Sequence, residues 1–337
     1  MISFENDYSE GAHERILERL LETNREQTVG YGLDPYCEAA AHKIRELCQD
    51  DTLQVHFLVG GTQTNKTVIA AALRPYQGVI CADTGHINTH ETGAIEATGH
   101  KAMALPGTDG KITAAQVDAY CAEGFNEHVV NPGMVYISQP TELGTLYTFD
   151  ELTALSEVCH KYHLPLFIDG ARLAYGLMAE GNDVQLPDLA RLCDVFYIGG
   201  TKVGALFGEA VVMSNPDINY NFRCMIKQNG GMLAKGRLLG LQFLTLLEDG
   251  LYFELGAHAD RLAMKLKQAL LDKGYPLVVD TTTNQLFPIF PDRKIEELGK
   301  NFRYCPHERI DADHSAIRFC TSWATREEDV DALIAAL

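Results

Sequence analysis

The chain has 337 residues, of which 46% are hydrophobic, and its 46 acidic and 28 basic side chains give a formal net charge of −18. This length allows a substantial core, in one large domain or two. The acidic balance argues against nucleic acid or an anionic membrane as the main partner, since both bind basic protein surfaces.

Two helices are predicted near the N-terminus, over residues 13–23 and 35–49. Pro35 is well placed at the start of the second helix, and the stretch before it, from Tyr31, is predicted to be a loop. From about residue 54 to 214, short apolar runs alternate with helical patterns. The predicted strands, rich in Val, Ile and Phe, cover residues 55–60, 79–83, 102–105, 134–139, 165–169, 195–199 and 210–214.

The clearest helix between these strands covers residues 150–162, with apolar side chains spaced along one face. Further helices are predicted at residues 68–73, from about Thr113, and at 231–247 and 251–273. The tail mixes strands at 277–279, 286–290 and 316–320 with short helices, the last of which follows a capping-box pattern from Thr325 to Glu328.

This alternation of strands and helices predicts an α/β fold, in which a large domain holds a mainly parallel, seven-stranded sheet flanked by helices. A smaller α+β domain is expected at the C-terminus. We divide the chain into an N-terminal arm and helix (residues 1–30), the large domain (31–250) and the small domain (251–337).

Nine cysteines are scattered along the chain with no Cys-x-x-Cys pair, and several lie in apolar runs. This usage is typical of reduced, buried thiols, and we expect a cytoplasmic protein. No apolar stretch approaches membrane-spanning length, and the acidic first residues lack a signal-peptide core.

Two strand ends carry the groups with the clearest chemistry. Asp169 and Arg172 follow one predicted strand, and Thr201 and Lys202 follow the next in a glycine-rich loop. Ligands in open α/β sheets bind beyond the carboxyl ends of the strands. A carboxylate that holds a protonated pyridine nitrogen and an amine that forms a Schiff base are what pyridoxal 5′-phosphate (PLP) needs. Asp169 and Arg172 can equally form a plain structural salt bridge.

A glycine-rich turn at residues 60–65 follows the first strand of the sheet and precedes a helix. Free backbone N–H groups, the helix dipole and the hydroxyls of Thr62 and Thr64 would form an anion cradle there, with Gly61 allowing close approach. The turn lacks the Gly-Lys-Ser/Thr of a nucleotide P-loop. It therefore fits the phosphate of a cofactor.

Histidines and an acid follow the next strand as His86, His90 and Glu91. A metal would need a further ligand, and none is evident, so we favour His86 stacked on a pyridine ring and expect no metal. In the small domain, Arg318 lies in an apolar strand, where it either snorkels to solvent or binds an anion such as a substrate carboxylate.

With these residues in this order, the chain resembles the threonine aldolase / β-eliminating lyase family, which are fold-type I PLP-dependent enzymes of the aspartate aminotransferase superfamily. The similar positions run nearly end to end: Asn6-Asp7, Tyr31 to Pro35, Gly61-Thr62 with Asn65, His86 with Glu91, Asp169 to Arg172, Lys202, and Arg318 before Thr321-Ser322-Trp323.

The resemblance implies PLP as cofactor and three catalytic residues: Lys202 in the Schiff base, Asp169 on the pyridine nitrogen and His86 stacked on the ring. It further implies that Gly61 and Thr62 hold the phosphate, that Arg172 contacts the ring hydroxyl or the substrate carboxylate, and that Arg318 binds this carboxylate. Thr201 is assigned to the cofactor site, and Asn6, Tyr31 and Thr141 to the substrate site.

Three segments depart from the family pattern. Thr141 stands where these aldolases carry a histidine near the substrate hydroxyl, and Asn6 replaces a serine that helps to bind the carboxylate. Leu233 and Ala234 replace Arg and Gln of a third motif. The residues expected to hold the cofactor match better than those expected to choose the substrate bond.

The implied activity is that of a PLP-dependent carbon–carbon lyase, a low-specificity threonine aldolase that converts threonine or allo-threonine to glycine and acetaldehyde. A β-eliminating lyase or racemase acting on another amino acid is the alternative, and a PLP or amino-acid binding protein is the non-enzyme alternative. The base for the hydroxyl proton stays open among His86, Glu142 and a phosphate-bound water. From the resemblance alone we expect a homodimer or homotetramer.

Overall fold

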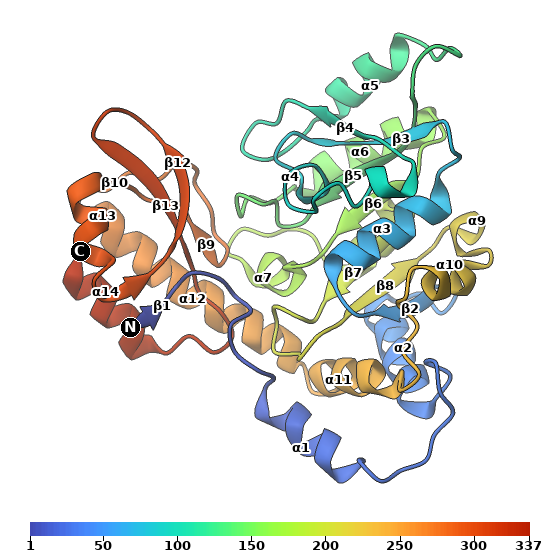
Figure 1. Cartoon of the computed structure of the whole chain (residues 1–337), viewed down its shortest axis with the longest axis horizontal. Helices are drawn as coiled ribbons and strands as arrows, with labels where there is room; N and C mark the ends of the chain where they lie inside the picture. Colours follow the sequence, from blue (N-terminus) through green and yellow to red (C-terminus); the bar gives the residue numbers. More distant parts are fainter.

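The computed structural model describes all residues from 1 to 337 and has two lobes of unequal size (Figure 1). The larger lobe is built on one seven-stranded sheet with the order β2-β8-β7-β6-β5-β3-β4. Its strands, in chain order, are β2 (Gln54–Leu58), β3 (Gln77–Ala82), β4 (Ala102–Leu105), β5 (Asn131–Ser138), β6 (Leu166–Asp169), β7 (Val195–Gly199) and β8 (Glu209–Met213). The expected α/β class and the seven strands are confirmed.

The sheet is parallel except for β8, which runs antiparallel to both of its neighbours, β7 and β2. The other six strands consequently share one direction, and their carboxyl ends lie at the same edge of the sheet. Because β8 runs the opposite way, its first residue lies at this edge. The sequence did not predict this reversal, and it places an additional side chain at the edge where ligands bind.

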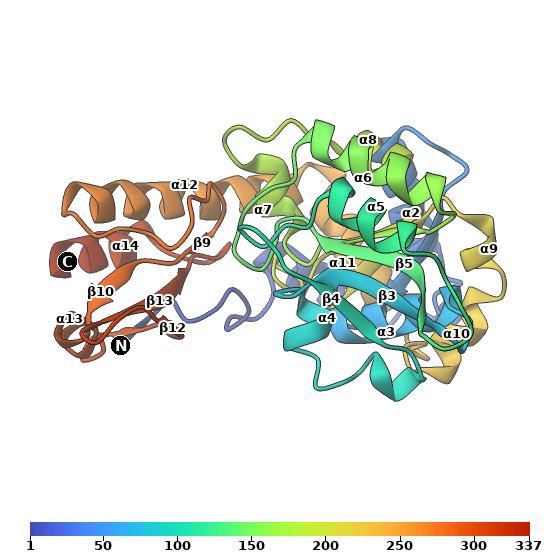
Figure 2. The ribbon, with the colours of Figure 1, turned by 90° about the horizontal axis from the view of Figure 1, so that it is seen from above.

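Apolar side chains on the two faces of the sheet form separate cores, as alternating residues of β6 and β7 point to opposite sides. The larger core has 45 buried residues and the smaller has 18. Helices cover both faces (Figure 2). The helices that pack on the larger core are α1 (Glu14–Glu22), α2 (Pro35–Cys48), α5 (Ala114–Ala122), α6 (Phe149–Lys161), α7 (Leu173–Met178), α8 (Leu186–Leu192) and α11 (Arg237–Glu248). The helices that pack on the smaller core are α3 (Gly61–Ala72), α4 (His86–Thr89), α9 (Pro216–Asn219) and α10 (Phe222–Gln228). A short 3-10 turn covers Glu96–Thr98.

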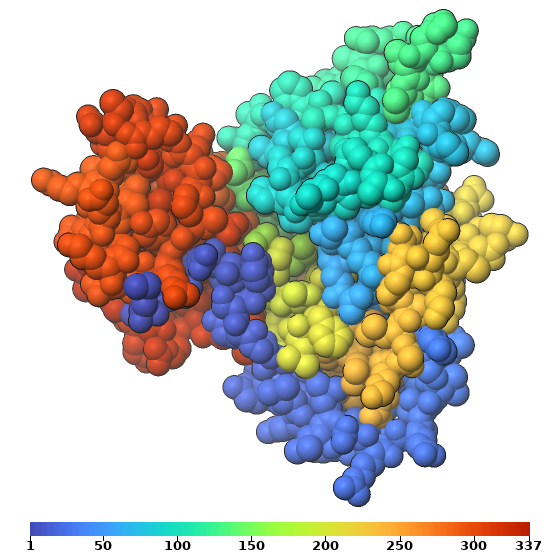
Figure 3. Space-filling view, in the orientation of Figure 1, coloured from blue at the N-terminus to red at the C-terminus, as the bar shows by residue number.

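The smaller lobe holds the C-terminal part of the chain and a third core of 13 buried residues. Its elements are α12 (Leu251–Asp272), β9 (Gln285–Leu286), β10 (Ile289–Pro291), α13 (Asp292–Leu298), β11 (Phe302–Arg303), β12 (Cys305–Arg309), β13 (His314–Cys320) and α14 (Glu327–Ala336). The N-terminal strand β1 (Ile2–Ser3) pairs with β11, and Phe4 packs in this third core. The space-filling view shows the N-terminal segment lying between the two lobes, with a notch above it (Figure 3).

Two helices begin at other places than predicted. Helix α3 starts at Gly61, so the glycine-rich turn is itself the first turn of the helix. Helix α11 starts only at Arg237, because the six residues before it pack on the loop around Tyr31. There the N–H of Tyr31 donates to the carbonyl of Ala234, and a Cβ on Gly236 would lie 2.2 Å from the backbone nitrogen of Gly32.

The tail differs from its prediction in three details. The single strand predicted over residues 286–290 is replaced by β9 and β10, because Pro288 between them lacks the N–H that a continuous ladder needs. Leu277 makes only an isolated bridge to Pro288. The predicted capping box does not form: Arg326 is the N-cap of α14 without a side-chain bond, while the Thr325 hydroxyl accepts from the N–H of Ser322. The proposed domain limits stay a prediction.

Candidate active site

A cleft opens at the edge of the sheet where the parallel strands end, with a volume of about 740 Å³ that includes its open mouth. Strand ends and the first turn of α3 supply most of its wall. The lining residues are Tyr8, Gly61, Thr62, His86, Ser138, Pro140, Thr141, Glu142, Asp169, Ala171, Arg172, Tyr197, Thr201, Lys202 and Glu209.

The first turn of α3 forms the anion-binding part of this wall. Its N-cap, Gly60, offers no side-chain bond to the helix, so the first N–H groups remain available to a ligand. A Cβ on Gly61 would lie 3.2 Å from the phenol oxygen of Tyr197, which explains why the smallest residue stands there. Thr62 lines the cleft, whereas Thr64 is fully buried and does not.

Asp169 is buried at the end of β6 and accepts four hydrogen bonds. Its Oδ2 accepts from the Tyr136 phenol at 2.6 Å and from Asn65 Nδ2 at 3.0 Å, and its Oδ1 accepts from the Tyr197 phenol and from the N–H of Ala171. Burial alone would raise the pKa of Asp169, but nearby His86 and the two phenols outweigh it and hold this pKa below its usual value. Asp169 is therefore ionised at neutral pH.

His86, the first residue of α4, is part of the same polar network. Its Nδ1 lies 2.8 Å from Oε1 of the buried Glu91, and the same oxygen accepts from Asn65 Nδ2 at 2.8 Å. A carboxylate on Nδ1 fixes the orientation of the imidazole and leaves Nε2 available. The ring of His90 stacks on His86 with centroids 5.5 Å apart. No group of three or more His, Cys, Asp or Glu side chains in the chain is arranged to hold a metal ion.

Lys202 is half-buried in the turn after β7, and its backbone carbonyl accepts from the phenol of Tyr175 at 2.6 Å. Burial, together with the charge of Arg172, lowers the pKa of the Lys202 amine, although Asp7, Asp169 and other carboxylates oppose this shift. A lowered amine pKa increases the neutral fraction, which is the form that attacks a carbonyl.

Comparison with known proteins agrees with this geometry. The sequence model of the family described as beta-eliminating lyase matches residues 7–291. The chain belongs to the beta-eliminating lyase family.

Three relatives of this lyase bear names that refer to threonine. It is 32% identical over 310 residues to a low specificity L-threonine aldolase of a Pseudomonas species, covering 90% of this chain and 88% of the relative. It is 30% identical to the enzyme of the same name from Pseudomonas aeruginosa, with 97% and 94% covered. A solved structure of Leishmania major threonine aldolase matches with a TM-score of 0.98 and 46% identity, over 99% of this chain and 98% of that one. The protein is a PLP-dependent lyase of fold type I.

The cleft of this lyase fits PLP in three respects. The open first turn of α3 suits a phosphate, the ionised Asp169 suits a protonated pyridine nitrogen, and the amine of Lys202 suits a Schiff base. All four hydrogen-bonding positions of the Asp169 carboxylate are already in use, so a pyridine N–H would share this carboxylate with the phenols.

Arg172 lines the cleft, but its guanidinium is ion-paired with a residue to which the sequence analysis had given no role. Nε and Nη2 of Arg172 donate to the two carboxylate oxygens of Asp7 at 2.7 and 3.0 Å, and Asn284 of the small lobe donates to Asp7 at 2.9 Å. Asp7 is fully buried, and despite this burial its ion pair with Arg172 lowers its pKa to about 2. The two N–H groups of Nη1 and the second N–H group of Nη2 are left for a ligand.

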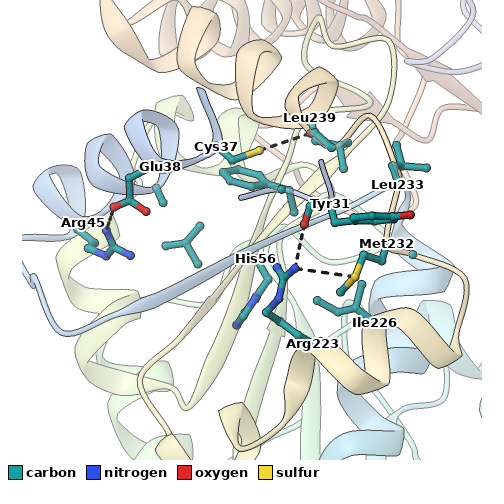
Figure 4. Close-up of a pocket in the computed structure, with 16 residues that line it drawn as sticks. Tyr31, Cys37, Glu38, Arg45, His56, Arg223, Ile226, Met232, Leu233 and Leu239 are labelled. Atoms are coloured by element: carbon teal, nitrogen blue, oxygen red, sulfur yellow. Dashed lines mark hydrogen bonds and ion pairs between the residues drawn. The ribbon is translucent and has the colours of Figure 1, made fainter. Parts of the chain in front are cut away.

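Three residues assigned to substrate lie outside the cleft wall. Tyr31 lines a separate pocket, where Arg223 donates to its carbonyl at 3.0 Å (Figure 4). Asn6 binds the N–H of Tyr8 and the hydroxyl of Ser9 within its own turn. Arg318 donates to Gln285 and to the carbonyl of Glu5, while its Nε has no partner.

Thr141 does line the cleft, but its hydroxyl is engaged elsewhere. Its Oγ1 lies 2.7 Å from Oγ1 of Thr145 and also accepts from the Thr145 N–H. The side chain is 1% exposed, and a Cβ on Gly110 would touch it. Thr141 therefore cannot replace the histidine of related aldolases as a base.

Sequence reasoning did not assign Tyr136, Tyr197, Tyr8 or Glu209 to the site. Tyr136 and Tyr197 lie in otherwise apolar buried strands, and a buried phenol needs a hydrogen-bond partner, so their presence was a usable signal. Sequence reasoning missed Glu209 because the strand was predicted to begin one residue later.

The helices of this lyase include none with the length and apolar character of a membrane-spanning segment.

Proposed function

We propose that this lyase cleaves the Cα–Cβ bond of threonine or allo-threonine to give glycine and acetaldehyde. The observation that carries the proposal is the convergence, in one cleft, of the α3 N-terminus, an ionised Asp169 and the amine of Lys202. The relatives named as threonine aldolases support this choice of substrate.

Each group of the cleft has a separate task in the proposed reaction. Bound PLP supplies the electron sink for the bond that breaks. The α3 N-terminus orients the phosphate, Asp169 keeps a negative charge beside the pyridine nitrogen, and Lys202 carries the covalent attachment. Nη1 of Arg172 is free to bind the ring hydroxyl or the substrate carboxylate.

Among the open choices of base, we propose His86. Glu91 occupies Nδ1 of His86, which leaves Nε2 to accept the β-hydroxyl proton. Glu142 is a weaker choice, because its Oε1 already accepts from the His86 N–H at 3.0 Å and from the Ser138 hydroxyl at 2.6 Å. Burial also raises the pKa of Glu142, which disfavours the ionised form that would accept a proton.

The test uses purified protein supplied with PLP and then incubated with L-threonine or L-allo-threonine, with acetaldehyde as the readout. We expect acetaldehyde from at least one substrate, and no product from Lys202→Ala, which should also lack the visible absorbance of lysine-bound cofactor. Turnover of serine or cysteine without any acetaldehyde from either threonine isomer would replace the aldolase proposal with β-elimination. Bound amino acid without turnover would indicate a binding protein.

We also propose that the protein is a homodimer or homotetramer in the cytoplasm, in which Tyr31 reaches the cleft of another copy. Tyr31 is 46% exposed, and Leu21, Val29 and Leu33 near it in sequence are 78%, 63% and 63% exposed. Burial of such exposed apolar side chains would favour an interface. The nine cysteines form no disulfide, as a reducing compartment requires. Sedimentation analysis, with Tyr31→Ala assayed for a raised KM, tests this assembly; an active monomer insensitive to Tyr31→Ala would refute it.

A further inference from the structure

Glu142 is a carboxyl of the cleft wall whose two oxygens have different surroundings. Oε1 accepts from the His86 N–H at 3.0 Å and from the Ser138 hydroxyl at 2.6 Å. Oε2 makes no hydrogen bond to another residue, yet it is not sealed from solvent like Oε2 of Glu91 and Glu209, because Glu142 is half-buried and lines the cleft. This oxygen is therefore available to a molecule bound in the cleft.

The surroundings of Glu142 favour its neutral form. Its carboxyl forms no ion pair, since the nearby imidazole of His86 pairs with Glu91 instead. Burial raises the pKa of Glu142, and the charge of Asp169 adds to this effect, while the Ser138 hydroxyl opposes it. Because both donors meet Oε1, this oxygen is the carbonyl of the neutral acid, and the proton lies on Oε2. Glu142 thus offers the cleft a hydrogen-bond donor.

The turn that carries Glu142 is fastened to the small lobe. The carbonyl of Gly144 accepts from the hydroxyls of Thr281 and Thr283 at 2.6 and 2.8 Å. A Cβ on Gly144 would lie 2.8 Å from both of these hydroxyls, so only glycine fits. The carbonyl of Glu142 itself accepts from Gln285 Nε2 at 3.4 Å. A donor held in this way keeps its direction and loses little freedom when a ligand binds.

We propose that Glu142 recognises the β-oxygen of the substrate through a hydrogen bond donated from Oε2. The inference rests on the proposed function, which places a β-hydroxy amino acid in this cleft with its hydroxyl at His86. A hydroxyl oxygen has two lone pairs, so it accepts from Oε2 while its own proton goes to Nε2 of His86. The O–H bond of Glu142 stays intact throughout, and Glu142 acts as a specificity residue that favours amino acids with an oxygen on Cβ.

The test compares two amino acids that differ at one position, where O-methyl-L-threonine carries an ether oxygen and L-isoleucine carries a methylene group. Neither has a hydroxyl proton, so neither can undergo the proposed cleavage. Both carry the same terminal methyl group, so steric effects cancel in the ratio of their dissociation constants. Binding to the full-length protein loaded with PLP is followed by its visible absorbance. We expect the wild type to bind the ether roughly tenfold more tightly, the effect of one hydrogen bond.

Two substitutions separate the donor from the rest of the side chain. In Glu142→Gln the two donors that meet Oε1 orient the amide, so its oxygen takes the place of Oε1 and its NH₂ group takes the place of Oε2. This variant should therefore keep the preference for the ether. Glu142→Met has a side chain of similar length without a donor, and it should lose the preference.

Equal dissociation constants in the wild type would overturn the proposal, as would a preference that survives in Glu142→Met or disappears in Glu142→Gln. If Glu142→Met does not fold, the wild type and Glu142→Gln still decide. Because neither amino acid is cleaved, the outcome is separate from the threonine assay. A preference for the ether with no acetaldehyde from threonine would uphold the recognition and reject the aldolase, and acetaldehyde with equal constants would do the opposite.

Discussion

The buried ion pair between Asp7 and Arg172 should fasten the N-terminal arm across the cleft, and Asp7→Asn should release it. Asp7 is fully buried, accepts both hydrogen bonds from Arg172 and a third from Asn284, and so joins the arm to both lobes. Replacing the carboxylate with an amide removes the charge while keeping the shape. The guanidinium of Arg172 then stays buried without its partner.

The size of the effect follows from the pKa of Asp7, which is about 2 against an ordinary value of 3.8. At about 1.36 kcal/mol per pH unit, this difference corresponds to about 2.5 kcal/mol of stabilisation of the docked arm at neutral pH, or about 60-fold in its opening equilibrium. Because the pKa is lower when the arm is docked, this contribution is complete above pH 3.8 and is lost as the pH falls toward about 2.

Hydrogen exchange of the segment 1–12, followed by mass spectrometry at pH 7, measures this opening directly. We expect exchange to be about 60-fold faster in Asp7→Asn, while Glu5→Gln, which changes an exposed carboxyl on the same arm, should exchange like the wild type. Protection in Asp7→Asn within twofold of the wild type would refute the reasoning, because it would mean that the ion pair contributes nothing to docking.

Three other changes have defined outcomes. Gly170→Ala places a Cβ 1.9 Å from a backbone carbonyl oxygen of β7 and should prevent stable folding. As a control, the Cβ of Gly11→Ala meets no atom within 4 Å, so this variant should melt at nearly the wild-type temperature. A folded Gly170→Ala with the wild-type melting temperature would contradict this prediction. Asp260 on α12 is buried with neither oxygen paired, and burial raises its pKa to about 9. In urea unfolding, the free energy of unfolding of Asp260→Asn should therefore increase relative to that of the wild type as the pH rises from about 4 toward 9. Tyr136→Phe removes a donor to Asp169 and should lower the free energy of unfolding by about 1.5–3 kcal/mol, and a loss below about 0.5 kcal/mol would argue against the phenol clamp.

Much of the cofactor site was predictable because its groups follow strands that the sequence marks clearly. The apolar runs before Asp169 and Lys202 identify buried strands, and parallel strands deliver their carboxyl ends to one edge. The alternation of strands and helices therefore predicted the fold class, and the order of the glycine-rich turn, the acid and the lysine predicted the cofactor. These are local signals, in which each functional residue lies within a few residues of the element that positions it.

The tertiary structure alone decided which partner each side chain meets. Asp7 and Arg172 are 165 residues apart in the chain, and Asn65 and Asp169 are 104 apart, so no spacing rule brings them together. The reversal of β8 placed Glu209 opposite Gly199 at the edge of the sheet, in the same cleft as Lys202, while Tyr31 packs against residues 223–236 and lies outside the cleft. The sequence by itself determined which chemical groups reach the edge of the sheet, because strand direction and hydrophobic pattern are encoded locally. Packing between distant segments decides which of these groups are paired, buried or left without a hydrogen-bond partner, and only the folded chain specifies that packing.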